Sequence, residues 1–228
     1  MTSDNTFLGG QAFAAILFDL DGTLIDSTPA VVTAWVSWAH EFGVDPAALR
    51  GMHGIPARGV IDRLLPNGPK AAAEARITEI EVATSAGIQL LPGAARALRT
   101  LSGHEPNRLA IATSCTDELF EARLSGTGLV RPDVVVTASH VARGKPSPDP
   151  YLAAAQRLSI DPAECLVVED AAAGLRSGKA AGCVTLAVTT STSREDLVAT
   201  GDADAIITSL ADVEFTVTPA GVTVTLVR

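Results

Sequence analysis

The chain has only three cysteines among its 228 residues, and this scarcity excludes several architectures. They are Cys115, Cys165 and Cys183, which form no CxxC pair and have no histidine-rich segment beside them. An odd count without metal-ligand spacing indicates neither a disulfide framework nor a zinc site. Cys165 and Cys183 adjoin apolar runs and are typical of small buried hydrophobic residues. We therefore expect a reducing, cytoplasmic location.

Positive charge is also scarce, because 17 Lys and Arg residues oppose 26 Asp and Glu residues and leave a formal net charge of −9. So acidic a chain is a poor candidate for general binding to nucleic acid or to an anionic membrane. A few cations and backbone N–H groups can still bind a small anion locally. No apolar run is long enough to span a bilayer, and the N-terminal segment lacks the basic start of a signal peptide. The oligomeric state stays open, and a monomer is compatible with the sequence.

Hydrophobic residues, by contrast, are plentiful at 47% of the chain, which is enough for a sizeable core. Short apolar runs typical of buried strands alternate with helical stretches, and this predicts an α/β fold with a mostly parallel sheet. The apolar runs lie at 14–20, 108–113, 133–137, 165–168 and 184–188, with a weaker run at 205–207. The helical stretches lie at about 93–102, 117–125, 148–158, 171–181 and 193–199.

Residues 29–90 interrupt the alternation. Val31, Trp35, Trp38 and Phe42 recur at the spacing of one helix face, and two further helical patterns follow without a strand-like run. We therefore predict a helical bundle at 29–90, inserted into an α/β core made of 1–28 and 91–228. The last residues, 213–227, alternate around a Pro-Ala-Gly turn and predict a hairpin that extends one edge of the sheet.

Polar groups follow the predicted strands at their carboxyl ends, which is where ligands bind in a doubly wound sheet. Asp19 and Asp21 follow the first strand, and Glu169 and Asp170 follow a later one. So many carboxylates repel one another unless a hard cation is present, and magnesium (Mg2+) prefers such oxygen ligands. One carboxylate could attack phosphorus, and its neighbour could serve as general acid and base.

Three other polar residues at strand ends could bind a phosphate. Thr113 and Ser114 follow one strand and can donate hydrogen bonds to phosphate oxygens. Lys145, in a Gly-Lys-Pro segment after another strand, can neutralise the nucleophile and the phosphate. Phosphoryl transfer needs little beyond such positioning and charge stabilisation.

Four segments together resemble the motifs of the haloacid dehalogenase-like (HAD) hydrolase superfamily, in the order in which that family has them. They are Phe18–Ser27, Ile111–Ser114, Gly144–Pro146, and Val168–Asp170 with Gly174. The resemblance covers the whole chain and implies a Rossmann-like core with a helical cap. It implies that Asp19 is the nucleophile and Asp21 the general acid/base. It further implies that Asp19, Asp21 (through its carbonyl oxygen) and Asp170 hold Mg2+, with Glu169 in support.

The insertion at 29–90 resembles the cap of the β-phosphoglucomutase-like branch, especially that of sugar and polyol phosphate phosphatases. This implies a small phosphorylated metabolite as substrate, with His53 and Arg58 on a cap loop that faces it. In the mutase, a histidine a few residues past the first motif helps to suppress hydrolysis. The corresponding place in this chain is close to Val31, and this difference favours a hydrolase over a mutase. A phosphomutase of the β-phosphoglucomutase type and a non-catalytic HAD-fold binding protein remain the alternatives.

Overall fold

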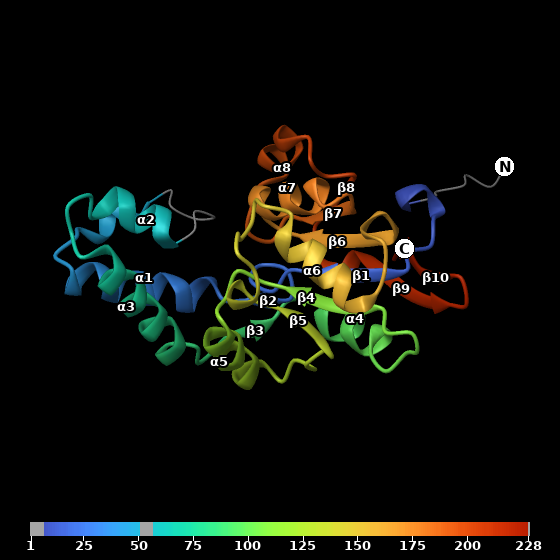
Figure 1. Ribbon diagram of the computed structural model, residues 1–228, viewed down its shortest axis with the longest axis horizontal. Coiled ribbons are helices and arrows are strands. Elements are labelled where there is room, and N and C mark those ends of the chain that lie inside the picture. The colour runs from blue at the N-terminus through green and yellow to red at the C-terminus, as the bar shows by residue number, and fades with distance from the viewer. Residues whose placement is uncertain (1–6, 51–56, 228) are drawn as a thin grey trace. The chain divides into compact units, whose positions relative to one another are not determined.

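The computed structural model describes residues 7–50 and 57–227, and its central element is a six-stranded parallel sheet (Figure 1). The strand order is β5-β4-β1-β6-β7-β8, and every neighbouring pair is parallel. This confirms the predicted α/β fold class. The strands are β1 (Ala15–Phe18), β4 (Leu109–Ala112), β5 (Val134–Val136), β6 (Cys165–Glu169), β7 (Val184–Val188) and β8 (Ala205–Ile207).

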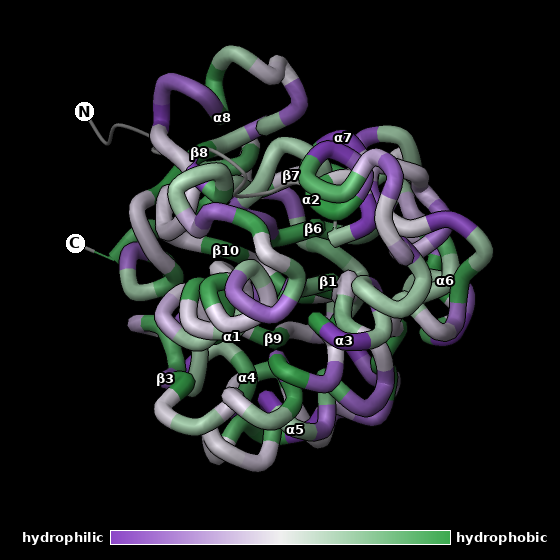
Figure 2. Tube along the Cα trace, turned by 90° about the vertical axis from the view of Figure 1, so that its left-hand side faces the viewer, coloured by the Kyte–Doolittle hydropathy of each residue, from purple (hydrophilic) through white to green (hydrophobic). Residues whose placement is uncertain are grey.

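Strand β1 lies in the middle of this sheet, and all of its side chains are buried on the two faces. This burial is what its unbroken apolar run predicts (hydropathy in Figure 2). Successive side chains of a strand point to opposite faces. Leu17 accordingly packs in a cluster with Tyr151 of helix α6, whereas Phe18 meets Phe215 edge-on at 5.8 Å between ring centroids. The helices that connect or follow the strands are α4 (Ala94–Leu101), α5 (Asp117–Thr127), α6 (Asp149–Leu158), α7 (Ala172–Ala180) and α8 (Arg194–Thr200).

The C-terminal hairpin does not extend the sheet, so this part of the sequence prediction is wrong. Strands β9 (Val213–Thr218) and β10 (Gly221–Leu226) pair antiparallel in a two-stranded sheet of their own. The alternation of the hairpin gives it one apolar face, which has to be buried against a core. Phe215 supplies that contact by packing on Phe18, while backbone bonds between Phe13 and Val222 tie the hairpin to the segment before β1.

The described residues form two compact units, one made of 7–26, 90–117 and 129–227, and the other of 27–50, 57–89 and 118–128. The second unit is helical and includes 118–128, a segment that the sequence prediction did not place there. Its helices are α1 (Thr28–Glu41), α2 (Ala57–Leu64), α3 (Lys70–Ala83) and most of α5. Two short strands, β2 (Ile25–Asp26) and β3 (Gln89–Leu90), pair with each other where the chain passes between the units. Turns of 3₁₀ helix lie at Phe7–Gly10, Pro46–Leu49, Ala138–His140, Pro162–Glu164 and Leu210–Asp212.

Trp38 is the centre of the helical unit. It is fully buried, stacks on Phe42 at 5.0 Å between ring centroids, and meets Trp35 edge-on at 5.2 Å. Its indole N–H donates to the carbonyl oxygen of Ala73 at 2.9 Å, which joins α1 to α3. Three residues of the predicted helical face, Trp35, Trp38 and Phe42, therefore pack in the core of this unit, whereas Val31 is half-buried outside that cluster. Among the described residues, no helix has the length and apolar character required to cross a bilayer.

Candidate active site

The candidate site lies at the carboxyl ends of β1 and β6, where the strand order of the sheet reverses. From β1 the chain continues to β4 and β5 on one side, then crosses to β6 on the other. In doubly wound sheets this switch point is where ligands bind. Asp19 directly follows β1, Glu169 ends β6, and Asp170 comes next. Parallel pairing therefore brings residues 150 positions apart to one edge of the sheet.

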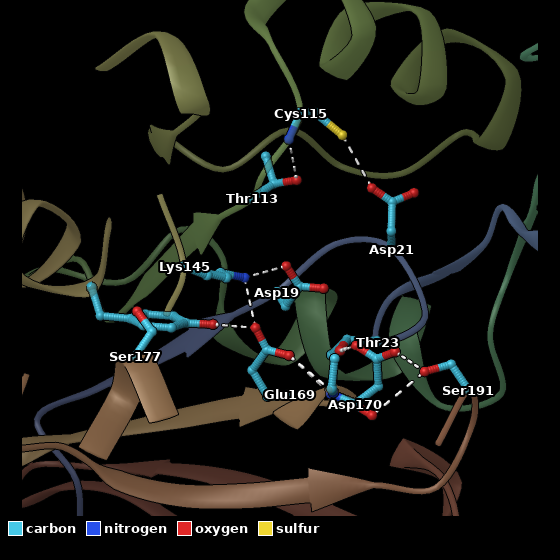
Figure 3. A network of polar contacts seen from close by, with 12 residues as sticks. Asp19, Asp21, Thr23, Thr113, Cys115, Lys145, Glu169, Asp170, Ser177 and Ser191 are labelled. Carbon is cyan, nitrogen blue, oxygen red and sulfur yellow. Dashed lines mark hydrogen bonds and ion pairs between the residues drawn. The ribbon is translucent and has the colours of Figure 1, made fainter. Parts of the chain in front are cut away.

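Lys145 lies between two of these carboxylates (Figure 3). Its Nζ donates to Oδ1 of Asp19 at 2.5 Å and to Oε1 of Glu169 at 2.6 Å. The three side chains are only 7%, 10% and 2% exposed, respectively. The low dielectric around them strengthens the attraction, but an unpaired member would be strongly unfavourable there.

Both oxygens of Glu169 are engaged by protein groups. Tyr151, which is fully buried, donates its phenol O–H to Oε1 at 2.9 Å, and its ring lies 5.1 Å from the Lys145 ammonium. The backbone N–H groups of Asp170 and Ala171 donate to Oε2 at 3.1 and 3.3 Å. At Gly174, any Cβ would overlap the Glu169 carboxylate, so only glycine leaves room for it. Glu169 is thereby fixed in one orientation.

The Asp170 carboxylate is held by two hydroxyl groups from different loops. Thr23 Oγ1 donates to Oδ1 at 3.2 Å, and Ser191 donates to Oδ2 (Figure 3). Ser191 belongs to the loop after β7, whose carboxyl end lies at the same edge of the sheet. Gly22 makes room for Asp170: its φ of +84° suits glycine, and a Cβ there would overlap the carboxylate.

Burial and like charges shift the protonation of this cluster. Burial raises the pKa of Asp19 well above its usual range despite the nearby Lys145, and the charges of Glu169 and Asp170 raise it further. Burial and the Glu169 charge raise the pKa of Asp170 to about 7. Burial alone would lower the pKa of Lys145, but the charges of Asp19 and Glu169 raise it, so the ammonium stays protonated. Negative charge is therefore in excess at the site.

The cluster fits a hard divalent cation. Asp19, Glu169 and Asp170 each offer a carboxylate oxygen, and these oxygens lie within 4.8 Å of one another. Together with Lys145 they have a formal charge of −2, which a divalent cation would offset. Oxygen-only donors suit Mg2+. Each oxygen of Glu169 already accepts two hydrogen bonds, whereas each oxygen of Asp170 accepts one from a hydroxyl group. A carboxylate oxygen has two lone pairs, so Asp19 and Asp170 are the better candidates for direct ligands.

Asp21 has surroundings of its own. Figure 3 shows its carboxylate directed toward Cys115, whose thiol donates to Oδ2 at 3.0 Å. Thr113, buried at the end of β4, accepts the Cys115 N–H through its hydroxyl oxygen at 3.1 Å. Ser114 is exposed. The two aspartates of the first loop thus face different partners, an ammonium for Asp19 and a thiol for Asp21.

The other predicted site residues belong to the helical unit. Arg58 is exposed in the first turn of α2. His53 lies outside the described residues, so its role stays a prediction. The polar network also includes four residues that were not predicted from the sequence, namely Thr23, Cys115, Tyr151 and Ser191. Thr23, Cys115 and Ser191 each follow a predicted parallel strand, and this position was the available signal, because those strand ends lie at the ligand edge.

Comparison with known proteins gives one family match and several curated relatives. Residues 13–182 match the family model described as haloacid dehalogenase-like hydrolase. Hexitol phosphatase A of Escherichia coli is 42% identical over 209 residues, which cover 90% of this chain and 95% of that protein. Glycerol-1-phosphate phosphohydrolase 2 of Saccharomyces cerevisiae is 33% identical over 190 residues, covering 77% of this chain and 74% of that protein.

A solved structure agrees with this match. A mutant of CbbY from Rhodobacter sphaeroides, crystallised with xylulose-(1,5)bisphosphate, superposes with a TM-score of 0.75 at 27% identity. The superposition covers 88% of this chain and 96% of that one.

Proposed function

Because the chain belongs to the haloacid dehalogenase-like hydrolase family, we propose that it hydrolyses small sugar or polyol monophosphates with Mg2+ through a phosphorylated Asp19. The broader class, a phosphoric monoester hydrolase, is confirmed by the family match and the curated relatives, as the sequence predicted. The buried Asp19 beside Lys145, at the ligand edge of the sheet, is the observation that carries the finer proposal.

In the first step, an Asp19 oxygen attacks phosphorus, and the bond from phosphorus to the leaving alcohol breaks. Asp21 as a carboxylic acid gives its proton to the departing oxygen, so a neutral alcohol leaves. Lys145 stabilises the charge on Asp19 and on the phosphoryl oxygens, and Thr113 donates its hydroxyl hydrogen to one of those oxygens. Ser114 donates through its backbone N–H.

In the second step, Asp21 as a carboxylate takes a proton from water, and the water oxygen attacks phosphorus. The bond to Asp19 breaks, and inorganic phosphate leaves with the carboxylate restored. Asp19 and Asp170, and Asp21 through its carbonyl oxygen, would hold Mg2+, with Glu169 in support. The cation supplies charge neutralisation at the phosphoryl group and at the carboxylate cluster. Tyr151 and the backbone N–H groups keep Glu169 oriented for this purpose.

The inserted segment 29–90 is proposed as the cap that recognises the alcohol part of the substrate, with His53 and Arg58 contributing. Arg58 is suitable for this purpose because it is exposed and bears a positive charge. An Arg58→Ala variant is expected to raise KM on the preferred substrate by roughly 10-fold and to leave the free energy of unfolding unchanged within about 0.5 kcal/mol. An unchanged KM would remove Arg58 from the proposal.

Phosphate release across a panel of sugar and polyol monophosphates, with and without Mg2+, tests the reaction. We expect Mg2+-dependent release with a clear preference, and no release from Asp19→Asn, which keeps the shape of the side chain but lacks the nucleophilic charge. Full activity of Asp19→Asn would contradict the mechanism. Isomer analysis of the same samples detects a phosphomutase, and Mg2+-dependent phosphate binding without turnover would indicate a binding protein.

Metal binding has a second readout that needs no substrate. A ligand that binds only the folded chain stabilises it, by about 2.7 kcal/mol at one hundred times its Kd. Thermal unfolding should therefore shift upward with increasing MgCl2 in the wild type and much less in Asp170→Asn. Equal shifts in both proteins would exclude Asp170 as a ligand.

A further inference from the structure

The thiol of Cys115 contacts the carboxylate that the proposed mechanism uses as general acid and base. Its Sγ donates to Oδ2 of Asp21 at 3.0 Å, and the cysteine is only 4% exposed. A thiol is a weak donor, but burial strengthens such a bond because water does not compete with it. The contact joins the loop after β1 to the loop after β4 (Figure 3).

Cys115 is itself fixed in place by the ends of two strands. Its N–H donates to Thr113 Oγ1 at 3.1 Å, and its carbonyl oxygen accepts the N–H of Ala138 at 2.8 Å. Thr113 follows β4, and Ala138 begins the turn after β5. The thiol position is therefore set by the sheet, and the bond transmits that position to the Asp21 side chain.

Proton transfer depends on such placement. A general acid has to keep its oxygen within hydrogen-bond reach of the leaving oxygen, and a misplacement of about 1 Å can lower the rate about 100-fold. Asp21 lies on a loop, where side chains are less well fixed than on helices or strands. The bond to Oδ2 holds the carboxylate in one direction.

We propose that Cys115 is a positioning residue for Asp21, an inference that rests on the proposed function. Cys115 forms no bond to substrate in this role and exchanges no proton with it. Because Cys115 acts only through the general acid Asp21, its replacement should lower the rate more when the leaving group needs a proton. An alkoxide leaving group needs that proton, whereas p-nitrophenolate leaves without it.

The test compares kcat/KM on glycerol 1-phosphate or a hexitol phosphate with kcat/KM on p-nitrophenyl phosphate. Cys115→Ala removes the donor, and Cys115→Val removes it while filling the space. We expect both to lose about 3- to 10-fold on the alkyl phosphate, as the loss of one hydrogen bond predicts, and to stay within about 2-fold of wild type on the aryl phosphate. Cys115→Ser keeps a donor and should recover most of the lost activity on the alkyl phosphate.

Cys183→Ala is the matched control, because Cys183 is similarly buried at 3% exposure but packs in the core cluster on the α6 side of the sheet. It should leave the ratio of the two kcat/KM values unchanged. An equal loss on both substrates in the Cys115 variants would indicate packing alone and overturn the proposal, as would no loss on either.

Failure of the proposed function itself would look different. The wild type would then release no phosphate from either substrate, or Asp19→Asn would stay active, and both proposals would fall together. With a Mg2+-dependent wild type and an inactive Asp19→Asn, the leaving-group comparison judges Cys115 alone.

Discussion

Removing the Lys145 ammonium is expected to destabilise the folded protein strongly. In Lys145→Met, Asp19 and Glu169 lose a partner at 2.5 and 2.6 Å, in a site where all three side chains are at most 10% exposed. Breaking a buried ion pair by deleting one partner destabilises by about 3–5 kcal/mol, because the remaining charge is buried without compensation. Here two carboxylates are affected, so we expect the loss to lie in that range even though methionine fills most of the space.

Urea unfolding at pH 8 without divalent cations measures this loss. With an m value of about 2–3 kcal/mol/M for a chain of this size, the midpoint should fall by roughly 1–2 M. The difference from wild type should shrink as the pH is lowered toward 5.5. Burial raises the pKa of Asp19 well above its usual range, and removing the Lys145 ammonium, which lowers this pKa, raises it further in the variant. Acid therefore neutralises the uncompensated charge in the variant at a higher pH than in the wild type, so the variant gains more stability on acidification.

A double-mutant cycle with Asp19→Asn separates the pair from other effects of Lys145. Asp19→Asn removes one of the charges that Lys145 compensates, so the double variant should be more stable than the sum of the two single losses predicts. Surface Lys70→Met is the matched control, since its ion pair with Asp62 is 44–48% exposed and should contribute at most about 1 kcal/mol. A midpoint for Lys145→Met within about 0.3 M of wild type would refute the reasoning.

Three further experiments test the packing around the site, in the core of the sheet and in the helical unit. Gly174→Ala places a Cβ on the Glu169 carboxylate, so it should weaken Mg2+-dependent stabilisation by roughly 10-fold in apparent affinity, measured by thermal unfolding at graded MgCl2. Cys165 and Cys183 should resist iodoacetamide at pH 8 in the folded chain and react in urea, as mapped by mass spectrometry, because burial raises the pKa of each to about 12. The unfolded chain releases these thiol protons at a lower pH than the folded chain, so the free energy of unfolding should fall as the pH rises above about 9. Trp38→Phe should lower the free energy of unfolding of the protein by about 1–3 kcal/mol, because it leaves a buried carbonyl of α3 without its indole donor.

The sheet could be predicted from the sequence because the composition of its strands differs clearly from that of the segments between them. Runs such as 14–20 and 165–168 are continuously apolar, which is typical of parallel strands covered on both faces. The carboxyl ends of parallel strands lie at one edge of the sheet, so the residues that follow these strands are placed at that edge without any knowledge of side-chain positions. That rule was enough to group Asp19, Glu169 and Asp170, which lie far apart in the sequence.

The hairpin shows where such reasoning fails. The alternation of Val213–Thr218 was recognised, but alternation gives only the number of buried faces and not the surface that buries them. Phe215 packs on the face of β1 through Phe18, a contact that depends on the path of the chain in three dimensions. The same limit applies to Cys115, since no spacing rule relates it to Asp21, 94 residues earlier.

The glycines of the site carry information that a turn-based reading of the sequence overlooks. Gly22 and Gly174 each stand where a Cβ would overlap a carboxylate, Asp170 in one case and Glu169 in the other. Because glycine has no side chain, the backbone of the loop after β1 and of α7 can lie close to these two carboxylates, where any larger residue would overlap them. Burial of this crowded site, together with the charge of Glu169, raises the pKa of Asp170 to about 7. Beside the Lys145 ammonium, the three carboxylates leave a formal charge of −2, so a divalent cation would relieve the repulsion that remains at the site.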